Sequence, residues 1–130
     1  MINALIIDDE AHCVEALMIL LNKYCPNVNV ISTCTDGECG LKSIEEHQPD
    51  LVFLDIAMPK MGGFDMLSRL DKIDFEIIFT TAYDNFAIKA FKVSAVDYLL
   101  KPVDKQELIN AVNVAEERIE LQKQNRQLSF

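Results

Sequence analysis

The feature that most constrains the fold is a regular alternation of two kinds of segment. Short runs rich in β-branched and aromatic residues recur along the chain, and longer stretches with apolar residues at three- and four-residue spacing separate them. The short runs predict strands at 4–8, 28–33, 51–55, 76–81 and 96–100. The longer stretches predict helices at 10–24, 37–47, 63–73, 85–93 and 104–124.

Alternating strands and helices predict parallel strands joined by right-handed crossover connections. The run Leu51–Leu54 is apolar at every position, which is typical of a strand covered on both faces. With 130 residues, the chain has the usual size of one domain. We therefore expect an α/β protein with a flavodoxin-like, doubly wound (βα)5 sandwich and a parallel five-stranded sheet of order 2-1-3-4-5.

Composition and charge exclude several classes of function. The net charge of −9 argues against binding of a nucleic-acid backbone by this segment, because such binding needs clustered Lys and Arg. No apolar run approaches the length of a membrane span, and no basic region precedes the first apolar stretch. The sequence therefore predicts a cytoplasmic protein that does not contact a membrane.

The four cysteines are Cys13, Cys25, Cys34 and Cys39. They form no C-x-x-C pair and have no matching histidine spacing, which disfavours both a zinc site and a secreted disulfide framework. We expect reduced, mostly buried thiols. His12 and His47 are isolated in the sequence, and we expect them to be ordinary surface or core residues.

Polar residues follow the predicted strands at their carboxyl ends. Asp8 and Asp9 follow the first strand, and Asp55, Thr81 and Lys101 end the third, fourth and fifth. In a sheet of this order the ends of strands one and three flank a crevice. Carboxylates about 4 Å apart repel one another by about 4 kcal/mol at an effective dielectric near 20, and Mg²⁺ relieves that repulsion while accepting a phosphate oxygen as a further ligand.

Each of these residues also has a purely structural interpretation. Asp8, Asp9 or Glu10 would serve as a cap for the first helix, and Asp55 would open a turn toward Pro59. Thr81 is also compatible with a strand-end turn and Lys101 with a solvated charge before Pro102. Convergence of four strand ends on one place favours a site over these separate roles.

The segments "IIDDE", "LVFLDIAMPKMGG", "FTTAYD" and "AVDYLLKPVD" occur in the order and spacing found in one family. The chain resembles the receiver (REC) domain of two-component response regulators over nearly its full length. The resemblance implies that Asp55 accepts a phosphoryl group from a phosphohistidine of a sensor histidine kinase. It also implies that Asp8, Asp9, Asp55 and the backbone carbonyl of Ala57 bind Mg²⁺, and that Thr81 and Lys101 hold the phosphoryl oxygens.

The same resemblance implies a conformational switch. Thr81 is expected to move toward the phosphoryl group while Tyr98 turns inward, and the Lys101–Pro102 peptide is expected to be cis, which would aim the ammonium inward. The alternative for Tyr98 is a strand aromatic packed against the last helix with its hydroxyl in water. Ala57 and Tyr83 offer little to orient an attacking water, which predicts slow self-dephosphorylation.

The stretch "FTTAYDNFAIKAFKVSAVDYLLKP" is most similar to receivers of the LytTR (LytR/AlgR) class. That similarity implies a transcription regulator with residues 1–120 as the receiver and 121–130 as the start of a linker to a DNA-binding output domain. It also implies a homodimer formed on phosphorylation. We expect a dimer face with the residues Ile88, Phe91, Lys92, Asp97 and Lys105, although its apolar members are also compatible with the core and its charges with solvent.

Three other functions compete with this interpretation. A Mg²⁺-dependent phosphohydrolase with an aspartyl nucleophile, of the haloacid-dehalogenase type, requires an acid where Ala57 stands. A flavin-binding module requires a hydroxyl- and Gly-rich loop after the first strand, and the chain has two acids there. A receiver that works only as a phosphorylation-independent interaction module is disfavoured because all five site positions are present. We therefore expect a signalling domain that catalyses only its own phosphotransfer and slow self-dephosphorylation.

Overall fold

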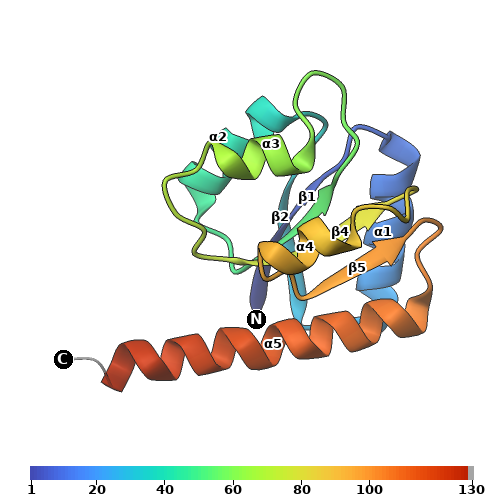
Figure 1. The fold of residues 1–130 in the computed structure, drawn as a ribbon. Helices are drawn as coiled ribbons and strands as arrows, with labels where there is room; N and C mark the ends of the chain where they lie inside the picture. The colour runs from blue at the N-terminus through green and yellow to red at the C-terminus, as the bar shows by residue number, and fades with distance from the viewer. Residues whose placement is uncertain (129–130) are drawn as a thin grey trace.

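Five strands and five helices alternate in the computed structural model, which describes residues 1–128 (Figure 1). The strands are β1 (Ile2–Ile7), β2 (Val28–Cys34), β3 (Leu51–Asp55), β4 (Glu76–Thr81) and β5 (Asp97–Leu100). The helices are α1 (Ala11–Tyr24), α2 (Gly37–His47), α3 (Gly63–Ser68), α4 (Ala87–Lys92) and α5 (Lys105–Leu128). Every predicted strand and helix is therefore present.

The strands form one parallel sheet of order β2-β1-β3-β4-β5, which confirms the predicted flavodoxin-like topology. Ile7 lies opposite Leu54 where β1 pairs with β3, and Thr81 lies opposite Leu100 where β4 pairs with β5. These pairs are the last rungs before the polar residues that follow each strand. The register therefore brings the predicted site residues to one edge of the sheet.

Successive strand residues point to opposite faces of the sheet, and both faces are apolar. Ile6, Phe53 and Ile78 pack in a cluster that also contains Leu21 of α1 and Leu108 of α5. The neighbouring strand positions, among them Ile7, Leu54 and Phe79, pack in a second cluster with Ile44 of α2, Met66 of α3 and Ala90 of α4. Figure 1 shows the sheet between these two helical layers. Two buried faces explain why the strands read as continuous apolar runs.

The third helix is shorter than its apolar spacing predicts. It ends at Ser68, where the Ser68 hydroxyl donates to the carbonyl of Asp65, and the next two N–H groups bond three residues back instead of four. Ile73, at the end of the predicted helix, is 40% exposed. The predicted helix over 63–73 is therefore wrong beyond residue 68, because the chain leaves the helix to enter β4.

The last helix is longer than predicted. Asp104 caps it, because its side chain accepts the N–H of Glu107 at 3.0 Å, and the helix runs on through Leu128. Arg118 anchors the helix to the sheet by contacting Glu76 of β4 at 3.4 Å and the carbonyl of Ser94 at 2.9 Å. No break in the helix marks position 120, so the boundary between receiver and linker stays a prediction. Residues 129 and 130 lie outside the described residues.

Two of the four cysteines differ from expectation. Cys34, the last residue of β2, forms a disulfide with Cys39 in the first turn of α2. The turn between them is tight, because the side chain of Asp36 caps α2 by accepting the N–H of Cys39 at 2.8 Å. The prediction of reduced thiols is wrong for this pair. Cys13 and Cys25 are free, and burial raises the pKa of both thiols.

Within residues 1–128, no helix combines the length and the apolar character needed to cross a bilayer.

Candidate functional site

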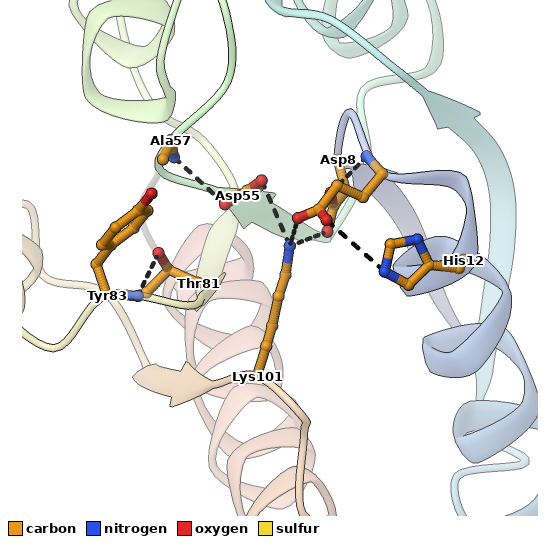
Figure 2. A network of polar contacts seen from close by, with 8 residues as sticks. Asp8, His12, Asp55, Ala57, Thr81, Tyr83 and Lys101 are labelled. Carbon is orange, nitrogen blue, oxygen red and sulfur yellow. Dashed lines mark hydrogen bonds and ion pairs between the residues drawn. The ribbon is translucent and has the colours of Figure 1, made fainter.

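Three of the predicted site residues meet at the carboxyl edge of the sheet. Lys101, directly after β5, places its ammonium nitrogen 2.9 Å from Oδ2 of Asp8 and 3.4 Å from Oδ2 of Asp55. Asp8 follows β1 and Asp55 ends β3, and both are almost fully buried. Figure 2 shows the lysine reaching up between the two carboxylates. The Lys101–Pro102 peptide is cis, as expected.

Each buried carboxylate uses its two oxygens differently. Oδ1 of Asp8 accepts the N–H of Glu10 at 3.0 Å, and Oδ1 of Asp55 accepts the N–H of Ala57 at 3.3 Å. The Asp55 bond is the local turn of the structural interpretation, whereas the Asp8 bond is a turn where that interpretation expected a helix cap. They leave Oδ2 of each residue directed at Lys101. Glu10 is the N-cap of α1 and makes no side-chain capping bond, so the expected alternative of a capping role does not hold for it.

Burial and charge determine the protonation of the site. Burial raises the pKa of Asp55 to about 6, and the charge of Asp8 adds to the effect, while Lys101 and the Ala57 N–H oppose it. Burial alone would lower the pKa of Lys101, but its hydrogen bond to Asp8 and the charges of Asp55 and Asp8 outweigh that effect and raise it. Lys101 is therefore a permanent cation, and Asp55 is a carboxylate that gains from any further positive charge.

The carboxylates are arranged so that they can hold a divalent cation. One side-chain oxygen from each of Asp8, Asp9, Glu10 and Asp55 lies within 4.8 Å of the others. Oδ1 of Asp9 is buried and has no hydrogen-bond partner among the described residues. A hard, all-oxygen donor set with an unsatisfied buried oxygen fits Mg²⁺. The role of the Ala57 carbonyl stays a prediction.

Glu10 is the residue that the sequence interpretation missed. It was considered only as a helix cap, yet its Oε1 lies 3.2 Å from the ammonium of Lys101. The third acid in the run "DDE" was the available signal. Its side chain reaches the site from the N-cap position of α1, where the N–H of Glu10 is bound to Asp8.

The predicted switch residues are linked through the backbone of Tyr83. Oγ1 of Thr81, which is fully buried, accepts the N–H of Tyr83 at 3.2 Å. The hydroxyl of Tyr98 donates to the carbonyl of Tyr83 and accepts the N–H of Phe86 at 3.3 Å. Tyr98 packs with the cluster on the α4 side of the sheet. The alternative for Tyr98, packing on the last helix with its hydroxyl in water, is therefore wrong.

The residues of the predicted dimer face are all exposed. Ile88 and Phe91 on α4 are 76% and 84% exposed, so the alternative that they belong to the core is wrong. Lys92 and Asp97 are also exposed on this side of the molecule. Lys105 turns toward α1, where its ammonium lies 5.3 Å from the centre of the Tyr24 ring. Lys105 is therefore the residue least suited to such a face.

Comparison with known proteins places the chain among signalling domains. The family model described as the response regulator receiver domain matches residues 4–113. An uncharacterized response regulatory protein of Vibrio cholerae is 45% identical over 113 residues, which are 86% of this chain and 47% of the relative. The transcriptional regulatory protein BtsR of Escherichia coli is 39% identical over 109 residues, 83% of this chain and 45% of BtsR. The chain thus spans about half the length of the curated relatives it matches.

A solved structure supports the same assignment. The REC domain of AraT, a response regulator from Geobacillus stearothermophilus, superposes with a TM-score of 0.79 at 32% identity. The match covers 93% of this chain and 98% of the AraT domain. The likeness therefore extends over the whole sandwich and includes every strand that contributes to the site.

Proposed function

The chain belongs to the response regulator receiver domain family, and from that premise we propose that Asp55 accepts a phosphoryl group from the phosphohistidine of a sensor kinase. The observation that carries the proposal is the convergence of Asp8, Asp55 and Lys101 at the edge of the sheet. Of the two acids in this group, Asp55 is the one that ends the central strand β3. Its Oδ2 faces Lys101, while its Oδ1 is oriented by the N–H of Ala57.

The transfer exchanges one bond of phosphorus for another. A carboxylate oxygen of Asp55 forms a bond to phosphorus as the phosphorus–nitrogen bond of the donor breaks, and the leaving imidazole keeps the electron pair and takes up a proton. Charge builds on the equatorial oxygens of the loose transition state. Lys101 already lies 3.4 Å from the accepting side chain and can donate to these oxygens with little rearrangement.

We assign the binding of Mg²⁺ to Asp8, Asp9, Asp55 and the carbonyl of Ala57. When bound, the cation would neutralise the carboxylates and the phosphoryl oxygens together. Glu10 holds Lys101 from the opposite side at 3.2 Å, which keeps the ammonium in the site when its bonds to Asp8 and Asp55 change.

Intact-mass spectrometry after incubation with acetyl phosphate and Mg²⁺ tests the proposal. The wild-type chain should gain the mass of one phosphoryl group, and Asp55→Asn should gain none. Asp65→Asn, which alters an exposed aspartate on α3, serves as the matched control and should react like the wild type. A phosphorylated Asp55→Asn protein, or an unreactive wild type, would contradict the assignment of Asp55.

The same samples separate a receiver from the competing phosphohydrolase. A receiver takes up phosphate once and holds it, whereas a phosphohydrolase turns over p-nitrophenyl phosphate continuously. Ala57 stands where the hydrolase needs an acid, so we expect no steady release of p-nitrophenol. Sustained turnover that depends on Asp55 would favour the hydrolase.

We further propose that phosphorylation acts on Thr81 and Tyr98 through Tyr83. A phosphoryl oxygen that attracts the Thr81 hydroxyl competes with the N–H of Tyr83, and the carbonyl of the same residue accepts the hydroxyl of Tyr98. Moving Thr81 therefore weakens the contact that keeps Tyr98 at the loop. An identical Tyr98 rotamer with and without beryllofluoride would contradict this switch.

The phosphoryl group on Asp55 is proposed to be long-lived. Ala57 offers no side chain that could orient water, and Figure 2 shows the ring of Tyr83 on the same side of Asp55 as Ala57. We expect Ala57→Asn to shorten the phosphoryl lifetime by about tenfold or more, since a positioned polar group contributes at least that much to such steps. Loss of label with time measures the lifetime, and an unchanged value in Ala57→Asn would contradict the proposal.

The output of the domain is proposed from its relatives. BtsR is a transcriptional regulatory protein, and the chain covers less than half of it. We propose that this receiver belongs to a transcription regulator of the LytTR class in the cytoplasm, with residues 121–130 leading to a DNA-binding domain. Phosphorylation would promote pairing through the exposed face of α4 and β5.

A further inference from the structure

A second group of metal-ligating side chains lies at the start of α1, beside the acidic site. It consists of Glu10, His12 and Cys13, whose ligand atoms all lie within 4.8 Å of one another. Nε2 of His12 is 3.7 Å from Oε2 of Glu10, and Figure 2 shows the imidazole turned toward the carboxylates of the site. The phosphotransfer chemistry uses neither His12 nor Cys13.

We propose that Glu10, His12 and Cys13 bind a thiophilic divalent metal such as Zn²⁺, at a site separate from the Mg²⁺ carboxylates. One oxygen, one imidazole nitrogen and one sulfur are a donor set that zinc accepts, with bonds of about 2.0–2.3 Å and a fourth position left to water or a ligand. Tetrahedral bonds of that length place ligand atoms about 3.3–3.8 Å apart. The 3.7 Å between His12 and Glu10 already lies in this range, and the Cys13 sulfur lies within 4.8 Å of both.

The chemistry of the two sites assigns them to different metals. Asp8, Asp9 and Asp55 offer only carboxylate oxygens, which suit a hard cation that keeps several waters. The thiolate and imidazole at the start of α1 instead favour Zn²⁺ and its neighbours in the transition series. Mg²⁺ at millimolar concentration should therefore fill the first site without displacing zinc from the second.

Glu10 lies between the two sites and directs a different carboxylate oxygen to each. Its Oε1 lies 3.2 Å from Lys101, while its Oε2 faces His12. The ammonium of Lys101 is held chiefly by Asp8 at 2.9 Å, and Lys101 also lines the cavity beside the three residues, so a metal bound there would take Oε2 of Glu10 and leave Oε1 to the ammonium. The neighbouring carboxylates also give this edge a negative character, which favours the approach of a second cation.

The site is also accessible. A cavity of about 410 Å³ opens next to the three residues and is lined by them together with apolar residues such as Leu17, Leu20 and Val103. Such a cavity supplies an entry path and room for the fourth ligand. His12 and Glu10 are exposed and Cys13 is partly exposed, so binding should be reversible and should not be required for folding.

Cobalt titration of the 130-residue chain tests the proposal. Co²⁺ replaces Zn²⁺ in tetrahedral sites, and a cobalt–thiolate bond gives a charge-transfer absorption that carboxylates do not give. The titration is done in excess Mg²⁺, so that the carboxylate site is filled. The chain offers matched controls, because it has only two histidines and two free cysteines. Cys25→Ser and His47→Ala should keep the absorption, whereas Cys13→Ser should abolish it.

The remaining variants identify the other ligands. His12→Ala and Glu10→Gln should weaken cobalt binding by at least about tenfold, because even the loss of an outer-shell partner of a ligand typically costs that much. A Cys34→Ser/Cys39→Ser background excludes thiols released from the disulfide and should keep the absorption. No thiolate absorption in the wild type, or its persistence in Cys13→Ser, would overturn the proposal.

A second measurement does not depend on variants that must fold. Stoichiometric Zn²⁺ should slow alkylation of Cys13 by iodoacetamide in the wild-type chain, as followed by peptide mapping, without changing the rate at Cys25. Equal alkylation of Cys13 with and without Zn²⁺ would contradict the site.

Discussion

At the scale of single residues, the acidic site is held in an electrostatically unfavourable state that a bound cation relieves. Asp55 is buried next to Asp8, and the single ammonium of Lys101 is shared among Asp8, Asp55 and Glu10. One positive charge therefore has to compensate three carboxylates. Such a site stores free energy that the binding of a cation can release.

Replacing the acceptor should therefore stabilise the fold in the absence of metal. The folded chain holds the proton of Asp55 with a pKa of about 6, against an ordinary value of 3.8. The charged form is thus disfavoured in the folded state, and this penalty applies above about pH 6 and disappears below about pH 3.8. Asp55→Asn should raise the free energy of unfolding at pH 7 in EDTA by about 1–2 kcal/mol, allowing for solvent screening.

Urea unfolding as a function of pH measures this effect. The difference between wild type and Asp55→Asn should shrink as the pH falls from 7 to 4, and Mg²⁺ should stabilise the wild type more than the variant. Asp65→Asn is the control and should follow the wild type. A destabilised Asp55→Asn protein at pH 7 would show that Asp55 makes a net favourable contribution.

The sequence allowed the site to be predicted residue by residue only in part. Asp8, Asp55 and Lys101 were predictable because parallel strands end at the same edge, so that residues after each strand must meet. The participation of Glu10 depends on the direction in which α1 leaves that edge, and the Cys34–Cys39 disulfide depends on a tight turn before α2. The run "DDE" signals a third acid near the site, but residue spacing alone predicts neither the contact of Glu10 with Lys101 nor the disulfide.

At the scale of the elements, the loop after β3 is fixed by close backbone contact. The N–H of Gly63 donates to the carbonyl of Ile56 at 2.9 Å, and α3 begins at Gly63. A Cβ at Gly63 would lie 2.6 Å from the carbonyl oxygen of Asp55. The glycine therefore serves close approach, and the left-handed residue of this loop is Lys60.

Adding a methyl group at this glycine should disturb both stability and reactivity. Gly63→Ala should lower the free energy of unfolding by about 1–3 kcal/mol, because backbone atoms must shift. It should also slow phosphorylation, since the clash is with Asp55 itself. Gly37→Ala is the control for reactivity, because the atoms nearest its Cβ would all be side-chain atoms of Met61, with Sδ at 2.5 Å, and none belongs to Asp55.

Urea unfolding and acetyl phosphate labelling measure the two effects of Gly63→Ala. A protein as stable and as reactive as the wild type would show that this loop has room to relax.

The bounds of the elements were predictable from the sequence only in part. The strand β3 was predicted at 51–55 because its apolar run is uninterrupted, but the end of α3 at Ser68 depends on a local hydrogen bond to Asp65.

At the scale of the whole molecule, the α4 face and the acidic edge of the sheet differ in what they expose. The α4 face presents Ile88 and Phe91 to solvent, whereas the acidic edge presents charge. The order of the strands was predictable, since right-handed crossovers leave few topologies. Which apolar residues are exposed to solvent was not predictable. The apolar spacing of α4 is the same whether those residues are buried in the core or exposed at an interface.

Pairing on phosphorylation should depend on this exposed apolar face. Phe91→Ser should weaken beryllofluoride-dependent dimerisation by at least about tenfold, or about 1.4 kcal/mol, because a large exposed aromatic is a typical interface anchor. Ile19→Ser is the control, since Ile19 is 65% exposed on α1 and lies away from α4. Sedimentation velocity measures the mass, and a dimer that is lost in Ile19→Ser and kept in Phe91→Ser would assign pairing to the other side of the molecule.

The peptide groups on either side of residue 83 join the acceptor edge to the exposed face. Thr81 bonds to the nitrogen of this residue and Tyr98 to its carbonyl oxygen. Because both bonds are to main-chain atoms, a coupling between Thr81 and Tyr98 through them would not depend on the side chain of residue 83. Under the proposed switch, Tyr83→Pro, which lacks the amide hydrogen, would break the link to Thr81 while leaving Asp55 and Lys101 in place.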